Sequence, residues 1–457
     1  MRRTATTAAV ALLVLAPACS AIFPPRQKPQ RCFVILVIDS LRADHVGTYG
    51  YGRDTTPAID ALSRDGVTFT SAWSQAPWTK PSVASLFTST YPSVHRVLYS
   101  KVIVNGEDRS DVLSGKFTTL AEAMKEAGYA TAAFGKKIHL RPQYGFSQGF
   151  DAYDMNAGDA DRINDAVTSW LRSEDPDRFF LYLHYNDVHY PYEPLKEGAV
   201  FGGGKPRVEI DGETKRAFRK GELKLTDEDV RQQVNLYDDE ILFTDRHVGD
   251  LMRSFEERGY SNVLVAVTAD HGEEFLDHGD ITHGQSLYNE LLRVPLVLGG
   301  SGVPEAVRGK RVAPAVQLID LMPTFLDLAG AQRPPLLQGR SIADFLLGRE
   351  PALPGEPAFS QRRDLHETEF SRCVFDGRWK LIIDASGGRT LLFNESADPG
   401  EHTSLTEREP GVVDSLMKMF QPWREANDAL HDAIRPEDTT PLDPKTEEQL
   451  RSLGYVD

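Results

Sequence analysis

The chain has little of what marks a disulfide-rich, nucleic-acid-binding or membrane-spanning protein. Its 457 residues include three cysteines, too few for a disulfide framework, and Cys32 and Cys373 can form at most one bridge. The formal net charge is −16, and no basic run follows the N-terminus, which argues against nucleic acid or an anionic membrane surface as a partner. An anionic substrate would therefore need a local focus of positive charge.

The N-terminus has the pattern of an export signal. Two arginines precede a short apolar stretch and the small-residue sequence Ala16-Pro-Ala-Cys19. The apolar stretch is too short to span a membrane. Because Cys19 resembles the lipid-modified cysteine of bacterial lipoproteins, we predict a signal peptide over 1–18, a lipid anchor at Cys19 and a tether over 19–31. The protein would then lie in the periplasm or on the cell surface; cleavage without lipidation would instead give a secreted enzyme.

Short apolar runs rich in β-branched residues alternate with helical patterns along the chain. The helical patterns cover 119–127 and 237–255. Such alternation predicts an α/β fold with a large, mostly parallel sheet sandwiched by helices. The strand-like runs are 32–38, 130–134, 179–183, 263–268 and 294–298.

A chain of 457 residues is longer than one ordinary domain. Because its sequence pattern also changes toward the C-terminus, two parts are predicted. We predict a catalytic domain over 32–349 and a smaller C-terminal α+β subdomain over 350–457. Within the second part, 373–383 has the pattern of a hairpin with an Asp-Gly turn, and 411–430 that of a helix. The charged, Gly-rich stretch 196–229 is typical of a surface insertion, which we place beside the site.

Two of the apolar runs end on acidic residues. One ends on Asp39, and the other ends on Asp270, which His271 follows. Open α/β sheets bind ligands beyond the carboxyl ends of their strands. If the two strands are neighbours, Asp39, Asp270 and His271 converge and imply a divalent metal ion. The alternative is that each aspartate caps the next helix.

Five separate segments carry a resemblance to a known family. They are VIDSLRADHVGTYGY (37–51), TKPSVASLFT (79–88), HYNDVHYPY (184–192), ADHGE (269–273) and DPGE (398–401). In this order they resemble the sulfatase family of the alkaline phosphatase superfamily, from about Arg31 to the end of the chain. The resemblance implies a sulfatase-like fold, hydrolysis of sulfuric or phosphoric esters, and a catalytic metal held by Asp39, Asp270 and His271.

The chain departs from the sulfatases at the nucleophile. Sulfatases carry Cys or Ser-x-Pro-x-Arg, whose first residue is oxidised to formylglycine. Aligned on Pro81, this chain has Thr79 at the first position and Val83 in place of the arginine. A threonine cannot become that aldehyde hydrate, but it can attack directly, as it does in lipoteichoic-acid synthase-like and phosphoethanolamine transferase-like branches. The metal ligands of those branches match Asp39, Thr79, Asp270 and His271.

The ligand set limits the choice of metal. Carboxylates suit Mn²⁺, Mg²⁺ or Ca²⁺, and the imidazole favours Mn²⁺ or Zn²⁺. A second metal would need more ligands, for which His283, Asp187 and His189 are the candidates. Thr79 precedes Pro81 at a predicted helix start, where backbone N–H groups favour an alkoxide and an anion. The alternative role for Thr79 is a helix cap.

Further catalytic candidates follow from the resemblance. His189 corresponds to the family histidine that touches oxygens of the transferring group, and His283 falls where phosphotransferase-like members have a histidine. Lys136, Lys137 and His139 lie near the family's Gly-Lys-x-His segment, with a spacing one residue long, so that either lysine can fit. Each histidine taken alone also fits a structural role.

These residues predict a metal-dependent hydrolase of sulfate or phosphate esters that attacks through Thr79. One alternative is a phosphotransferase that acts on an envelope lipid or glycan. The other is a catalytically silent, exported binding protein that retains the metal pocket. The expected partner is an anionic ester on a glycan, lipid or small molecule, with no nucleic acid and with membrane contact only through Cys19.

Overall fold

The structure is a computed structural model of the chain. The predicted signal peptide, the lipid-anchor cysteine and the first part of the tether lie outside the described residues and stay predictions. Residues 27–31 lie against the body, where the buried side chain of Lys28 contacts the hydroxyl of Tyr260. Within the part of the chain that the structure describes, no helix has both the length and the apolar character needed to cross a bilayer. The described residues are 27–195, 198–202, 204–363, 369–385, 388–436, 438–453 and 455.

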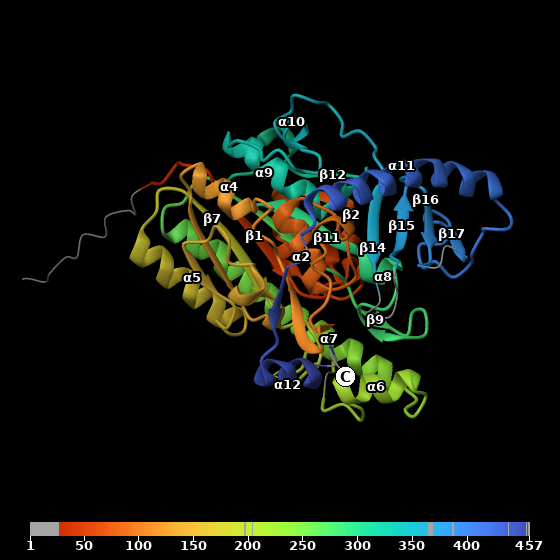
Figure 1. The fold of residues 1–457 in the computed structure, drawn as a ribbon. Coiled ribbons are helices and arrows are strands. Elements are labelled where there is room, and N and C mark those ends of the chain that lie inside the picture. The colour runs from red at the N-terminus through yellow and green to blue at the C-terminus, as the bar shows by residue number, and fades with distance from the viewer. Residues whose placement is uncertain are drawn as a thin grey trace, which may run out of the picture.

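A nine-stranded sheet forms the centre of the molecule (Figure 1). In spatial order its strands are β12 (Lys310–Val312), β2 (Val67–Trp73), β11 (Arg293–Gly299), β8 (Val263–Thr268), β1 (Cys32–Ile38), β7 (Phe179–Tyr185), β5 (Ala130–Gly135) and β6 (Ala152–Asp154), with β13 (Val316–Gln317) beside β2. All neighbours pair in parallel except β11, which runs antiparallel to β2 and β8. The central strands β1 and β8 are buried along their whole length and are almost entirely apolar, because both faces of the sheet are covered. The prediction of a mostly parallel sheet is confirmed.

Helices lie on both faces of this sheet (Figure 1). One group that packs together is α1 (Pro57–Asp65), α5 (Ala160–Glu174) and α7 (Asp227–Glu257). The other is α2 (Thr79–Thr88), α4 (Leu120–Glu126), α9 (Leu321–Ala329) and α10 (Ala343–Leu346). Helix α7 is amphipathic and buries Tyr237, Ile241 and Leu251, as its apolar spacing indicates. The predicted sandwich of helices around a sheet is therefore present.

A second, antiparallel sheet begins at Ala358, inside the stretch predicted as the C-terminal subdomain. Its strands are β14 (Ala358–Arg362), β15 (Ser371–Phe375), β16 (Trp379–Ile383) and β17 (Thr390–Asn394). The predicted hairpin is the β15–β16 pair, and the predicted helix is α11 (Pro410–Ile434), which packs on this sheet through Leu416 and Phe420. Cys32 and Cys373 are buried free thiols in different sheets.

Short elements complete the described chain. They are α3 (Pro92–His95), α6 (Gly212–Arg219), α8 (Asn289–Leu292), α12 (Pro444–Ser452), β3 (Val102–Val104), β4 (Glu107–Val112), β9 (Glu274–Phe275), β10 (Ile281–Thr282) and β18 (Asp438–Pro441).

A buried ion pair joins the second sheet to the central part of the molecule. The ammonium of Lys380, in β16, lies 2.9 Å from Glu401 Oε1 and donates to Asn289 Oδ1 at 3.0 Å. The backbone N–H of Asn289 donates to Glu401 Oε2 at 2.6 Å. The same ammonium lies 5.3 Å from the ring centroid of Trp73, in β2. Glu401, the last residue of the DPGE segment, thus has a structural role in this arrangement.

Replacement of Lys380 by methionine should lower the free energy of unfolding by about 3–5 kcal/mol, because the Glu401 carboxylate would stay buried without its partner. Chemical denaturation measures the change. The double variant Lys380→Met/Glu401→Leu should recover most of the loss, since neither charge then remains. A single variant as stable as the parent would contradict this assignment.

Candidate active site

The carboxyl ends of β1 and β8 bring the predicted metal ligands together. The two strands are parallel neighbours with Val37 opposite Thr268, so the residues that follow them share one edge of the sheet. Asp39 follows β1, and Asp270 and His271 follow β8. One ligand atom of each of these three residues lies within 4.8 Å of the other two. The convergence predicted from the strand ends is confirmed.

One atom of each predicted ligand faces a common centre, and of these Asp39 Oδ1 also accepts from the Ser40 hydroxyl at 3.0 Å. Asp270 Oδ1 accepts from the backbone N–H groups of Ser40 (3.3 Å) and His271 (3.1 Å), whereas the buried Oδ2 has no partner among the described residues. His271 Nδ1 lies 2.8 Å from the carbonyl of Gly272, so its Nε2 carries the lone pair. That Nε2 lies 3.6 Å from Asp39 Oδ1 and 3.5 Å from Asp270 Oδ2. Because a buried, unpartnered carboxylate oxygen is costly, the donor set fits a divalent cation.

The other carboxylate oxygen of Asp39, Oδ2, has a lysine and a histidine as its partners. Lys137 Nζ lies 2.5 Å and His184 Nε2 2.8 Å from Asp39 Oδ2. The hydroxyl of Tyr182 lies 2.8 Å from His184 Nδ1 and fixes that ring. Burial acts to raise the pKa of Asp39, but the Lys137 ammonium, with His189 and His184, holds this pKa well below its ordinary value. Asp39 is therefore ionised, as a predicted metal ligand needs to be.

Thr79 directs its hydroxyl at the same centre. It is the first residue of α2, is fully buried, and has its Oγ1 3.3 Å from His271 Nε2. The residue that caps the helix is Trp78, and the Thr79 hydroxyl bonds to the histidine rather than to the helix backbone. Thr79 is therefore not the cap of this helix, and its hydroxyl lies beside the predicted metal ligands.

The structure places Lys137 at the site and Lys136 away from it. Lys136 pairs with Asp159 at 2.6 Å, and its side chain is 55% exposed, so the prediction that either lysine fits is corrected in favour of Lys137. His139 is buried, with Nδ1 2.9 Å from Ser100 Oγ and with an Nε2 that has no partner among the described residues. The two lysines diverge because successive residues of an extended segment point to opposite sides.

Replacement of Lys137 by methionine should lower kcat/KM by about 10²–10³-fold, because Asp39 loses the buried ammonium that holds its pKa down and the site loses a positive charge. Lys136→Met is the matched control and should stay within about two-fold, since an exposed ion pair contributes little. Steady-state kinetics of both variants measures the effect. Equal losses in the two variants would contradict the placement.

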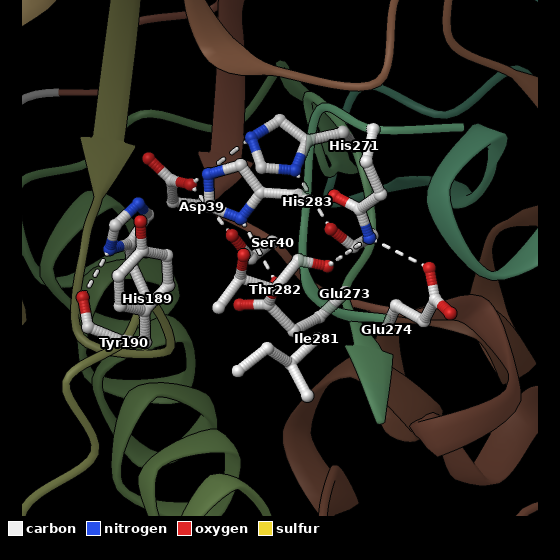
Figure 2. Close-up of polar contacts among 12 residues, drawn as sticks. Asp39, Ser40, His189, Tyr190, His271, Glu273, Glu274, Ile281, Thr282 and His283 are labelled. Atoms are coloured by element: carbon white, nitrogen blue, oxygen red, sulfur yellow. Dashed lines mark hydrogen bonds and ion pairs between the residues drawn. The ribbon is translucent and has the colours of Figure 1, made fainter. Parts of the chain in front are cut away.

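Two more histidines face the metal ligands. The ring centroids of His271 and His283 are 4.3 Å apart, and those of His189 and His283 are 4.9 Å apart. Figure 2 shows the rings of His271 and His283 side by side next to Asp39. His283 Nδ1 lies 3.0 Å from Glu273 Oε1. Burial is the main cause that lowers the pKa of both His189 and His283 well below the ordinary value, so both rings are neutral.

Glu273 is the buried partner of His283. Burial raises the pKa of Glu273 to about 8, although the hydroxyl of Tyr192 donates to Oε2 at 2.8 Å. Asp187, a candidate for a second metal, instead accepts from the backbone N–H of Ala160 at the start of α5. Among the described residues, the group that converges as metal ligands is the one at the ends of β1 and β8.

Sequence reasoning missed four residues at the site. His184 and Glu273 lie inside segments that carry the resemblance. The sequence could have indicated His184 by its place at a strand end and Glu273 by its closeness to His271. Lys215, in α6, is 5% exposed and donates to the hydroxyl of Tyr190 at 3.3 Å. Tyr455 reaches His189 and His283 from a segment without a motif. No local pattern indicates the last two.

The mostly parallel sheet presents two carboxylates, an imidazole and a hydroxyl at one edge, where open α/β sheets bind their ligands. The chain matches the sulfatase family over residues 31–331, and over 279–423 it matches the C-terminal region of N-sulphoglucosamine sulphohydrolase. The chain therefore belongs to the sulfatase family, whose members hydrolyse sulfuric or phosphoric ester bonds.

Similar proteins cover most of the chain. A Δ4,5-hexuronate-2-O-sulfatase of Bacteroides thetaiotaomicron is 23% identical in an alignment of 424 positions that covers 85% of this chain and 87% of that protein. Arylsulfatase K of Mus musculus is 24% identical in an alignment of 421 positions that covers 79% of this chain and 73% of that protein. The crystal structure of the phosphonate monoester hydrolase of Agrobacterium radiobacter has the same fold, with a TM-score of 0.71 and 21% identity, over 87% of this chain and 96% of that chain.

Proposed function

We propose that the protein hydrolyses a phosphate, phosphonate or sulfate ester through direct attack by Thr79. The observation that carries the proposal is the Thr79 hydroxyl 3.3 Å from His271 Nε2, beside the converging ligands Asp39 and Asp270. A divalent cation held by these residues would supply positive charge that makes the hydroxyl more acidic and neutralises an ester oxygen.

The chain's own residues account for the remaining steps. The N-terminus of the ten-residue helix α2 and the Lys137 ammonium favour an anion beside Thr79. As the bond from Thr79 Oγ1 to phosphorus or sulfur forms, the bond to the leaving oxygen breaks. The leaving oxygen takes up a proton on the side that His189 and His283 line, and in the overall step this proton balances the one that the Thr79 hydroxyl gives up. Water then attacks the threonyl ester, releases the phosphate, phosphonate or sulfate anion, and its proton restores the Thr79 hydroxyl.

A threonine nucleophile favours a phosphorus ester over a sulfate ester as the substrate. A threonyl sulfate lacks the elimination route of the formylglycine hydrate and would turn over slowly, whereas hydroxyl nucleophiles pass phosphoryl groups readily. Val83, where sulfatases have an arginine, is 1% exposed inside the core and offers no charge. The fold shared with phosphonate monoester hydrolases supports a phosphorus ester, and the similarity to a hexuronate-2-O-sulfatase supports an ester carried on a glycan.

A panel of aryl phosphate, aryl phosphonate monoester and aryl sulfate tests the proposal, with Mn²⁺, Zn²⁺, Mg²⁺ and Ca²⁺ each supplied to metal-stripped protein. We expect metal-dependent release of the alcohol, fastest from a phosphorus ester. Binding of the esters without turnover under every metal would favour a silent binding protein. Transfer of the phosphoryl group to an added alcohol in preference to water would favour the phosphotransferase.

A further inference from the structure

We propose that Tyr455 occupies the subsite for the alcohol half of the ester, so that a substrate must displace this side chain to reach Thr79. The inference rests on the proposed ester hydrolysis, because it names the part of the site that takes the leaving alcohol. Its ligand class is an alcohol R–OH, bound either as the leaving half of the ester or as the free product.

The hydrogen bonds of Tyr455 are those that such an alcohol would make. Its hydroxyl lies 2.5 Å from His189 Nε2 and 3.2 Å from His283 Nε2. His189 Nδ1 lies 2.5 Å from the carbonyl oxygen of Tyr190, and a carbonyl can only accept, so Nδ1 carries the proton and Nε2 accepts. The hydroxyl of Tyr455 therefore donates to His189, and its lone pairs face His283. A departing alcohol between two imidazoles needs the same arrangement.

The reactive groups are closed to solvent with Tyr455 in this place. Thr79 and His271 are 0% exposed, Asp270 is 1%, His283 is 3% and His189 is 5% exposed. An ester cannot reach Thr79 unless a covering group moves. Tyr455 is itself partly exposed, so its side chain borders solvent.

The groups that surround the Tyr455 ring indicate which kind of alcohol the subsite would accept. The ring packs edge-on to His139 with centroids 4.2 Å apart, and it joins a small apolar cluster with Ile138 and Leu450. The Lys215 ammonium lies 6.0 Å from its ring centroid. The vacated space would thus take the carbon skeleton of an alcohol between an apolar wall and a cation.

The segment that carries Tyr455 can move without opening the central core. Helix α12 packs beside α6 (Figure 1), and its apolar contacts form a cluster separate from the main one. Polar contacts hold it to its neighbours, namely Lys101 with Glu447 (2.7 Å), Arg216 with the carbonyl of Arg451 (3.2 Å) and, just after the helix, the hydroxyl of the buried Tyr190 with the carbonyl of Leu453 (2.7 Å). Segments held by few contacts open at low free energy.

Kinetics of three variants test the proposal on the aryl ester that the panel selects. Tyr455→Ala should lower KM about 10-fold with kcat within about three-fold, because the substrate no longer competes with a tethered hydroxyl. Tyr455→Phe removes the hydroxyl but keeps the ring and should lower KM less. Glu447→Gln loosens α12 at a contact outside the site and should lower KM by about two- to three-fold. A higher KM or a kcat more than about 10-fold lower in Tyr455→Ala would overturn the proposal, and so would an unchanged KM.

Amide hydrogen exchange of the unaltered protein is a second test of the proposal, and it does not require enzymatic turnover. Saturating phenol, as the alcohol probe, should speed amide exchange in α12, because it takes the place of Tyr455. Unchanged or slower exchange would overturn the displacement. A protein that hydrolyses no ester in the panel but still shows faster exchange with phenol would contradict the proposed function and leave the alcohol subsite supported.

Discussion

Replacement of Thr79 by alanine should lower kcat by about 10⁴–10⁶-fold, because a reaction that proceeds through a covalent ester loses its nucleophile. The buried Thr79 hydroxyl lies 3.3 Å from His271 Nε2, beside the side chains that would hold the cation, whereas the Ser40 hydroxyl donates to Asp39 Oδ1. Steady-state kinetics measures the loss. Intact mass after rapid quenching should show one phosphoryl group on the parent protein and none on the variant.

Two controls separate the missing nucleophile from a damaged helix. Thr79→Ser keeps a hydroxyl at the same place and should retain activity within about 10²-fold. Thr88→Ala lies on the same helix, where its hydroxyl bonds to the carbonyl of Ala84 away from the metal ligands, and should leave kcat unchanged. Full activity of Thr79→Ala would rule out this residue as the nucleophile.

The centre of the fold was readable from the sequence because burial on both faces forces continuous apolar runs. The run before Asp39 and the run before Asp270 show this, and both strands lie where they were expected. The reversed direction of β11 was not readable. An apolar run such as Val294–Leu298 looks the same in either direction, and its direction depends on where the connecting chain returns.

The metal ligands and Thr79 were predictable for a local reason. Each follows a strand end or begins a helix, so parallel strands alone bring these residues to one edge. Lys136 and Lys137 are adjacent, and a shift of one residue decides which of them points into the site. Spacing along the sequence does not fix that shift. Lys215 and Tyr455 come from segments whose position depends on packing between α6 and α12. Such long-range packing leaves no periodic trace in the chain.

Replacement of Asp270 by asparagine should weaken divalent-cation affinity by at least about 10²-fold and remove most activity, because the isosteric amide lacks the negative charge. The Oδ2 atom of Asp270 is buried, has no hydrogen-bond partner among the described residues and lies 3.5 Å from His271 Nε2. Elemental analysis after dialysis and titration calorimetry with Mn²⁺ and Zn²⁺ measure the affinity.

The matched control for that variant is Asp159→Asn, which removes an exposed carboxylate paired with Lys136 and should bind metal as the parent does. Chelation of the parent protein should abolish turnover, and added Mn²⁺ or Zn²⁺ should restore it, whereas chelated Asp270→Asn should recover little at the same metal concentration. Undiminished turnover by chelated, metal-free parent protein would contradict the metal centre itself. Full metal occupancy in Asp270→Asn would contradict only the role of this carboxylate, because Asp39, His271 and Thr79 would then suffice to hold the cation.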